Sequence, residues 1–562
     1  MKKISKHIIF LLISVASLVS CDLLDVDSNR LTFKDEYQMK SANDTLYSMF
    51  GIFSQLQKLS DSYVILGELR ADLLDVSEDT DTYLKEINNF SPSASNPYTN
   101  NLKDYYAVIN NCNYIINTID TSVVKGSVKV MKKVYAASKA IRAWTYIQMA
   151  LNYGQVTYFD KPILSIVDAE KKDYPVYNIE QLAPVLIADL LPYKDVDKPS
   201  LGSLSTHDMA DAFFPIRFLL GDLYLWTGQY ENAANEYHDL MLKSKYLVLE
   251  DYSSRLEVVN NAFTGRYSSN PNWGNLFTFG SAEYITAITT SNQYGHYFNL
   301  DSLNLQLKFK PSDIALNNWN SQKYVHSATL DTLGDQRKLY SVARVQRNSY
   351  SSTGVYFNLG DLNGVPNCIN KWSYMNPLNY NIKQVIPYRV ALLYLRYAEA
   401  VNQMGKPNLA LAVMKYGLNR SNITGRVPSS EKSDPLPNYM NFPNDIFDYY
   451  IEVNRVPKRI TNVGTKSRGM GNIQLDTVYC RIPDYAGSAD PKADSIRFVE
   501  DMIVDELALE TAFEGNRFHD LMRVALRRND FTFLANKVAA KHTENKEAIR
   551  QKLMDKNNWF LK

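Results

Sequence analysis

The sequence predicts a mainly α-helical scaffold of tetratricopeptide-like helix pairs, with long irregular loops and a few short strands on one face. In the stretch from Val134 to Pro162, the apolar residues Ala140, Trp144, Ile147 and Leu151 recur at i, i+4, i+7 and i+11. This spacing is typical of one continuous helix face. Two further segments share the spacing of a helix-pair repeat, and two long regions rich in turn-forming and aromatic residues interrupt the helical pattern.

The N-terminus has the pattern of a secretory signal: three lysines, then an apolar run from Ile8 to Val19 that is too short to span a bilayer comfortably. The ending Leu18-Val19-Ser20-Cys21 resembles a bacterial lipobox. We therefore predict that residues 1–20 are a lipoprotein signal peptide and that Cys21 is lipidated. A plain signal peptide with an incidental cysteine is the alternative.

Three acidic residues, Asp22, Asp25 and Asp27, follow the anchor and resemble the surface-export signals of some Gram-negative lipoproteins. A solvated linker explains them equally well. No later segment reaches about 18 unbroken apolar residues. We expect a protein tethered to the outer membrane, exposed on the cell surface, with residues 21–562 forming a single domain.

Helical spacing defines the first part of that domain. Residues 31–60 and 102–119 are predicted to be helices, and the stretch at Val134 forms a helix that Gly154 ends. Residues 71–101 instead combine acidic residues with Ser-Pro-Ser and Asn-Pro-Tyr, which predicts a loop of turn formers between helices.

The repeat signal is clearest from Phe214 to Tyr237, where small residues allow two antiparallel helices to approach and a glycine makes the turn. The same spacing returns from Tyr388 to Arg420. The matching positions are Gly221, Gly228 and Ala233 in the first segment and Ala398, Gly405 and Ala410 in the second. This pattern predicts helix pairing and does not specify a ligand.

Residues about 250–385 and about 424–496 are predicted to be loop insertions with short strands, since they are rich in Asn, Ser, Gly, Pro and aromatic residues. Long loops in a compact fold are often functional. Helical pattern resumes from Asp501 to Arg528 with a break at residues 514–516.

Glu506, Glu510 and Glu514 repeat at i+4 in that last segment. They could form a carboxylate pair for acid–base chemistry. We favour a structural charge network in which Arg517 and Arg523 supply the cations.

Composition excludes several classes of protein. Without residues 1–20 the chain keeps 58 Lys and Arg against 60 Asp and Glu, a net charge of −2, which argues against nucleic-acid binding. The remaining cysteines, Cys112, Cys368 and Cys480, are too sparse for a disulfide framework or a local zinc motif and are expected to be buried small hydrophobes. The seven histidines show no ligand spacing, and His519 is expected on a helix surface. We assign no catalytic residue, metal or cofactor.

Most of the 39 tyrosines are expected to pack between helices with a solvated hydroxyl, although some could line a polar-ligand or protein interface.

The chain resembles the SusD/RagB family of outer-membrane nutrient-binding lipoproteins. The resemblance covers nearly the whole chain and is carried by the lipobox and by three blocks: RAWTYIQMALNYGQVTYF at 142–159, IPYRVALLYLRYAEAVNQMGKPNLAL at 386–411 and ELALETAFEGNRFHDLMR at 506–523. Leu507 departs from the pattern, because the family commonly has Arg there.

The resemblance implies a non-enzymatic protein with four tetratricopeptide-like helix pairs. Members bind glycans, or in some cases oligopeptides, and act as a lid on a SusC-type TonB-dependent transporter. A glycan site needs aromatic platforms with polar groups at their edges. Composition and the family's usual binding region suggest these candidates: Asp72, Asp79, Asp81, Tyr98, Trp273, Tyr294, Tyr297 and Trp319.

Two alternatives to glycan binding stay open. The same architecture could bind oligopeptides. A secreted hydrolase is the second alternative, although the chain lacks HExxH, GxSxG and phosphate-loop motifs.

Overall fold

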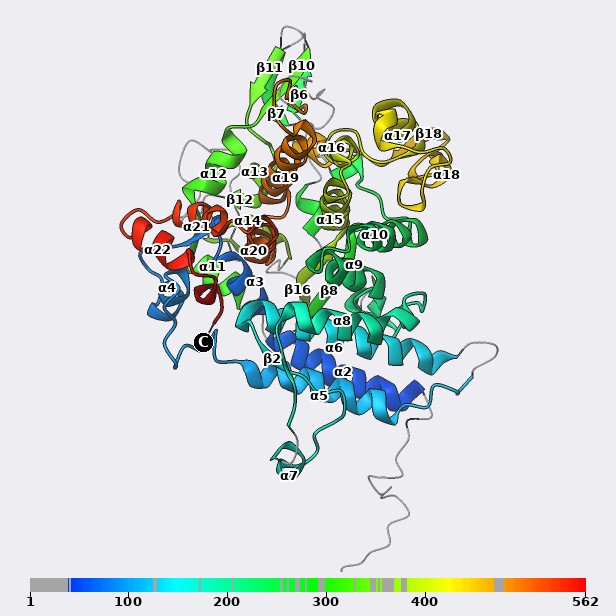
Figure 1. The fold of residues 1–562 in the computed structure, drawn as a ribbon, viewed down its shortest axis with the longest axis vertical. Coiled ribbons are helices and arrows are strands. Elements are labelled where there is room, and N and C mark those ends of the chain that lie inside the picture. Colours follow the sequence, from blue (N-terminus) through cyan, green and yellow to red (C-terminus); the bar gives the residue numbers. More distant parts are fainter. Residues whose placement is uncertain are drawn as a thin grey trace, which may run out of the picture.

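Helix α6 (Val130–Tyr153) is enclosed by neighbouring helices (Figure 1). Every residue from Ala136 to Asn152 is buried, because α5 (Leu102–Thr118), α8 (Ile179–Leu190) and α9 (Ile216–Trp226) pack around it. Gly154 ends the helix at φ +79°, a backbone conformation that favours glycine, and its N–H donates to the carbonyl of Ala150. The core helix predicted from the apolar spacing is confirmed.

The computed structural model describes most of the chain: residues 39, 42–124, 129–170, 173–204, 207–252, 256–259, 262–267, 273–277, 280–291, 299–327, 330–343, 350–351, 354–355, 368–375, 382–469 and 480–561. The predicted signal peptide, Cys21, Tyr294 and Tyr297 lie outside these residues. None of the described helices combines the length and the apolar character that crossing a bilayer requires.

The helices of the N-terminal half precede or form the first repeat: α2 (Ala42–Lys58), α3 (Ser60–Glu68), α4 (Thr82–Asn88), α5 (Leu102–Thr118), α7 (Ile166–Glu170), α8 (Ile179–Leu190), α9 (Ile216–Trp226) and α10 (Tyr230–Ser244). The later helices are α11 (Leu300–Leu305), α12 (Asp313–Asn320), α13 (Lys338–Ser341), α14 (Asn370–Met375), α15 (Val390–Gln403), α16 (Pro407–Lys415), α17 (Arg420–Arg426), α18 (Asn444–Phe447), α19 (Pro491–Glu510), α20 (Arg517–Arg528), α21 (Phe531–Ala539) and α22 (Lys546–Leu553).

Short 3₁₀ helices join them: η1 (Leu191–Tyr193), η2 (Met209–Ala212), η3 (Glu250–Tyr252), η4 (Gly274–Phe277), η5 (Ser429–Glu431), η6 (Asn438–Met440), η7 (Thr465–Gly469) and η8 (Lys556–Trp559).

The predicted repeats are the antiparallel pairs α9–α10 and α15–α16, and α10 packs on α15 to join the two pairs (Figure 1). Gly228 and Gly405 make the two turns at φ +73° and +77°. A Cβ on Gly221 would lie 2.3 Å from Cε1 of Tyr237, so only glycine allows this close helix approach. The repeat prediction is confirmed.

The described strands form two-stranded antiparallel sheets. Their pairs are β1 (Leu74–Val76) with β9 (Phe309–Pro311), β2 (Val156–Thr157) with β3 (Val176–Tyr177), β4 (Ser203–Leu204) with β5 (His207–Asp208), β6 (Leu256–Val259) with β7 (Ala262–Tyr267), β8 (Tyr284–Ser291) with β16 (Ile382–Arg389), β10 (Lys323–Ser327) with β11 (Leu330–Leu333), β12 (Val342–Ala343) with β15 (Cys368–Ile369), β13 (Tyr350–Ser351) with β14 (Gly354–Val355), and β17 (Asp448–Val453) with β18 (Val456–Thr461).

Two boundaries differ from the sequence predictions. The supposed loop 71–101 contains α4, which forms because Asp81 accepts a hydrogen bond from the N–H of Leu84 (3.1 Å) and because Leu84 and Ile87 are buried. Helix α19 begins at Pro491, well before Asp501, because Asp490 caps it and proline favours the first helical position.

Within 250–385 the described residues form the expected short strands together with the short helices α11 to α14.

The three glutamates of the last helical segment are neutralised by cations other than the predicted ones. Glu510 accepts hydrogen bonds from Arg337 (2.6 Å), Arg389 (2.7 Å) and Arg468 (3.1 Å). Glu506 pairs with Arg337, and Glu514 pairs with Arg389 and Lys371. The network prediction was right about the anions and wrong about the cations, because the partners come from other parts of the fold.

Arg517 and Arg523 pair elsewhere, Arg517 with Asp72 and Arg523 with Glu399 and Asp520. His519, expected on a helix surface, is buried. Burial and the positive charge of Arg70 hold its pKa well below the ordinary value. The prediction that Cys112, Cys368 and Cys480 are buried and form no disulfide framework is confirmed.

Candidate functional site

The two regions that supply the sequence candidates meet in space. Strand β1 pairs with β9 in antiparallel register, with Leu74 opposite Pro311 and Val76 opposite Phe309. The loop after α3 therefore lies beside the segment that contains α11 and β9. We call the exposed part of this contact, formed by Asp61, Asp79, Asp81, Tyr98 and Asn299, the junction surface.

Side chains beside the strand pair hold the two segments in place. The hydroxyl of Thr80 donates to the carbonyl of Lys308 (2.5 Å), and Lys308 Nζ donates back to the carbonyl of Asp79. Ser312 Oγ donates to the carbonyl of Asp72 (2.6 Å). These bonds link residues more than two hundred positions apart, so the junction surface has a rigid base.

Glu86 fixes the loop that carries Tyr98. Its Oε2 accepts hydrogen bonds from the N–H of Ser93 (2.9 Å), from the Ser93 hydroxyl (2.8 Å) and from Asn96 Nδ2 (3.0 Å), and these donors lower the pKa of Glu86. Asn96 Oδ1 accepts from the N–H of Tyr98 (3.1 Å). The tyrosine is held by its backbone.

Two carboxylates act on the Tyr98 hydroxyl. Burial raises the pKa of Tyr98 to about 12, and the carboxylates of Asp81 and Asp61 contribute to the increase. Asp61 Oδ2 also accepts a hydrogen bond from the N–H of Asn299 (3.0 Å). The junction surface therefore presents a half-buried ring, its hydroxyl and several carboxylate oxygens, the groups that can contact the apolar face and the hydroxyl rim of a sugar.

Three of the sequence candidates lie on this surface. Asp79 is exposed, and Asp81 and Tyr98 are partly exposed. Asp81 also caps α4, so its oxygen has a structural role beside any role in binding. Tyr294 and Tyr297 lie outside the described residues.

The other three candidates are buried. Asp72 pairs with Arg517, and Trp319 Nε1 donates to the carbonyl of Leu509 (3.2 Å). Trp273 packs against Phe277, and the side chains of Lys371 and Arg389 lie within 6 Å of its ring centroid. These side chains offer no exposed surface in this structure, and we leave them out of the junction surface.

Sequence reasoning did not find Asp61 or Asn299. Asp61 lies in the first turn of α3 and Asn299 immediately precedes α11, and neither has a spacing that points to binding. Only the pairing of β1 with β9 brings them together.

Two other features bear on the alternatives to binding. Glu506, Glu510 and Glu514 are sealed in the interior by arginine and lysine, so they are not accessible as an acid–base pair. In the part of the chain that the structure describes, no three His, Cys, Asp or Glu side chains are placed to hold a metal ion.

Two hollows lie away from the junction surface. One, of about 560 Å³, lies between α17 and residues 429–441. A second, of about 290 Å³, lies in the helical scaffold.

Comparisons with known proteins agree with this architecture. The chain is 23% identical over 360 residues to the SusD-like protein P2 of Formosa agariphila, a match that covers 60% of this chain and 65% of the length of that relative. A SusD homologue from Bacteroides thetaiotaomicron has a similar fold, with a TM-score of 0.56, 16% identity and coverage of 90% of this chain and 89% of that one.

A structure from Bacteroides vulgatus, provisionally named as a sugar binding protein, is also similar, with a TM-score of 0.53, 14% identity and coverage of 87% and 88% of the two chains. The model of the SusD family matches residues 251–560, more than half of the sequence. The chain therefore belongs to the SusD family.

Proposed function

We propose that this protein is a cell-surface lipoprotein that binds a glycan at the junction surface and delivers it to a SusC-type TonB-dependent transporter in the outer membrane. Family membership supports this function, and the provisional naming of a structural relative as sugar binding favours a glycan. The observation that carries the proposal is the Tyr98 ring held beside the carboxylates of Asp61 and Asp81.

Rigidity is the reason why this arrangement suits a sugar. Weak stacking and hydroxyl contacts yield useful affinity only when the protein groups do not lose much entropy on binding. The contacts of Glu86 and Lys308 order the junction surface before any ligand arrives.

A binding screen of purified protein against polysaccharides and against peptide mixtures tests the ligand class. We expect a polysaccharide to bind, and the Tyr98→Ala variant to bind it about tenfold more weakly through loss of the ring contact. The control is Tyr450→Ala, which removes a tyrosine that is 68% exposed on the β17–β18 hairpin. Binding of peptides alone would instead identify an oligopeptide carrier.

We further propose that the helical scaffold docks on the transporter as a hinged lid, with Cys21 lipidated to keep the protein at the membrane. A ligand favours closure only by its greater affinity for the closed state. The glycan should therefore bind more tightly to the purified complex with the transporter than to this chain alone, and equal affinities would contradict the lid.

A further inference from the structure

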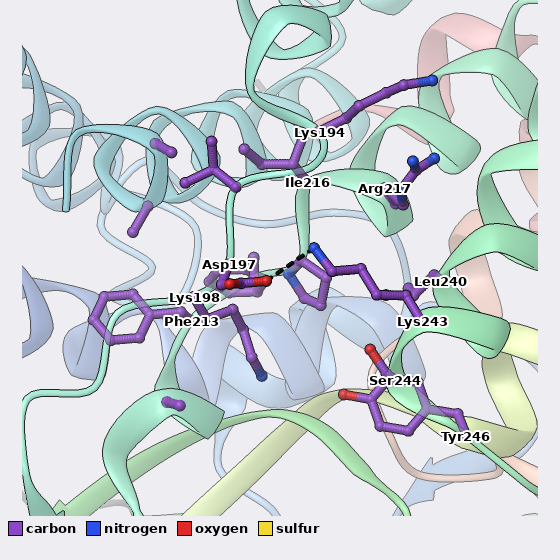
Figure 2. A pocket seen from close by; sticks show the side chains of 16 residues that line it. Lys194, Asp197, Lys198, Phe213, Ile216, Arg217, Leu240, Lys243, Ser244 and Tyr246 are labelled. Carbon is purple, nitrogen blue, oxygen red and sulfur yellow. Dashed lines mark ion pairs between the residues drawn. The ribbon is translucent and has the colours of Figure 1, made fainter. Parts of the chain in front are cut away.

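A cavity of about 290 Å³ lies in the helical scaffold, and Figure 2 shows the side chains that line it. Its walls come from α6, α9 and α10 and from the connecting residues 194–198 and 210–215. The volume is near the lower end of the range of about 300–1,000 Å³ that is usual for ligand pockets. It suits one ring-sized group and is too small for an oligosaccharide.

The floor of the cavity is apolar. Phe213, Phe214, Ile216 and Leu240 line it, and they are almost fully buried in the core. Ala136 and Ala137 of α6 add small side chains, which leave the space open. An apolar group that displaced water from this floor would be stabilised in proportion to the apolar area removed from water.

Positive side chains surround the floor, and two of them are already committed to internal partners. Arg217 Nη1 and Nη2 donate to Asp239 (3.0 Å) and Asp195 (2.6 Å). Lys194 Nζ donates to Glu236 (2.7 Å), and Figure 2 shows this side chain pointing away from the other labelled residues.

Lys198 is incompletely neutralised. Its Nζ donates to the carbonyl of Ile285 (3.0 Å), and its nearest carboxylate, Asp211, is 3.4 Å away and 48% exposed. Burial disfavours the ammonium and lowers the pKa of Lys198, and Asp211 offsets only part of that effect. A second anion beside this lysine would be stabilised.

Lys243 reaches toward Asp197 and forms an ion pair of 2.9 Å, the dashed line in Figure 2. Both side chains are largely exposed, at 44% and 61%. Exposed ion pairs of this kind contribute little free energy. A ligand carboxylate can therefore take the place of Asp197 on Lys243 at small cost.

We propose that this cavity binds a small apolar carboxylate. The apolar group lies on the floor formed by Phe213, Phe214, Ile216 and Leu240, the carboxylate pairs with Lys243 in place of Asp197, and Lys198 supplies a second positive charge to the same pocket. A neutral sugar would make no ion pair with Lys243, and an inorganic anion would leave the floor hydrated. Neither of these two ligands would contact both the apolar floor and the lysines.

Calorimetric titration of the lipid-free mature protein with N-acetylphenylalanine, phenylacetate and hexanoate tests this inference. At least one should bind with millimolar or better affinity. N-acetylphenylalanine amide, which lacks the charge, and inorganic phosphate, which lacks the apolar group, should bind at least about tenfold more weakly. Equal binding of the amide, equal binding of phosphate, or no binding by any of the three carboxylates would overturn the proposal.

Variants locate the site. Lys198→Met and Lys243→Met should each weaken carboxylate binding about tenfold, whereas Lys432→Met should not. Lys432 is the matched control because its Nζ also donates to backbone carbonyls, those of Ile423 and Thr424, at a distant position. Unchanged affinity in both test variants would contradict the assignment.

Occlusion gives a second test that does not remove a charge. Ser244 is exposed at the end of α10 and lines the cavity, so Ser244→Trp should block ligand entry while circular dichroism shows an unchanged fold. All of these variants should retain glycan binding at the junction surface, which separates failure of this inference from failure of the proposed function. If a folded Ser244→Trp protein bound the carboxylate as tightly as the wild type, the assignment of the ligand to this cavity would be contradicted.

Discussion

Arg517 holds Asp72 in a two-point ion pair between residues 445 positions apart, with 2.7 Å from Nε to Oδ1 and 2.8 Å from Nη2 to Oδ2. Both side chains are buried. Burial alone would raise the pKa of Asp72, but the charge and hydrogen bonds of Arg517 outweigh it and hold this pKa below the ordinary value. A carboxylate that composition suggested for ligand binding therefore joins α20 to the loop after α3.

Asp72→Ala should lower the free energy of unfolding by about 3–5 kcal/mol, because the buried Arg517 guanidinium loses its carboxylate partner and keeps the carbonyl of Val504 as an acceptor for Nη1. Urea denaturation followed by circular dichroism measures the change. The folded fraction of the variant should bind glycan as well as the wild type. A stable variant that loses only glycan binding would show that Asp72 contacts the ligand.

Gly67 of α3 touches the turn before α20. A Cβ on Gly67 would lie 1.8 Å from the carbonyl oxygen of Gly515, a backbone atom that cannot move aside easily. Gly67→Ala should therefore destabilise the protein by about 3 kcal/mol or more through overpacking. Thermal unfolding of the purified variant tests this value.

Gly51 is the matched control, because it also lies in a helix but has no atom within 4 Å of an added Cβ. Gly51→Ala should stabilise the protein by about 0.5–1 kcal/mol, since alanine loses less backbone entropy in a helix. Similar effects of the two substitutions would contradict the close contact at Gly67.

Glu510 should be the most sensitive member of the buried charge network. Burial would raise its pKa, but Arg389, Arg468 and Arg337 together hold it well below the ordinary value. Glu510→Gln should lower the free energy of unfolding by at least about 3 kcal/mol, since three buried guanidinium groups lose a charged acceptor. The exposed Glu547, replaced by Gln, should change the urea midpoint little.

The acid sensitivity of this protein should depend on His542. Burial, with a contribution from Lys541, lowers the pKa of His542 from 6.5 to about 4. Between these values the unfolded chain binds a proton that the folded protein does not, so stability is full above pH 6.5 and falls as the pH approaches 4.

Urea midpoints measured across this pH interval test the prediction. The His542→Leu variant should show a shallower decrease than the wild type, because it has no proton to bind at this position. Parallel curves for the two proteins would assign the acid sensitivity to other groups, such as His519, whose pKa is also lowered.

Local patterns predicted the scaffold well. The apolar face of α6 and the stop at Gly154 are visible in consecutive residues, and the two helix pairs follow from glycine and alanine spacings within single segments. Helix α4 was missed because its signals, one capping residue and two buried apolar residues, are few in a segment rich in turn formers.

The junction surface was predictable only in part. Asp79, Asp81 and Tyr98 lie in one segment with an acidic and aromatic composition, which drew attention to them. Trp273 and Trp319 lie in a segment that is also rich in aromatic residues, but both are buried. The reason is that η4 packs on α14 and α12 packs on α19. Composition indicates that an aromatic residue is available but not which side of the fold it faces.

The sequence by itself determined the family, the core helix that Gly154 ends and the pairing of the repeats, because these depend on spacings that neighbouring residues set. Only the tertiary structure decided which polar residues face solvent, which arginines neutralise the glutamates of α19, and where the cavity beside Lys243 lies. Those outcomes depend on contacts between segments that are far apart in the sequence. The energies of such contacts cannot be read from the local spacing of residues.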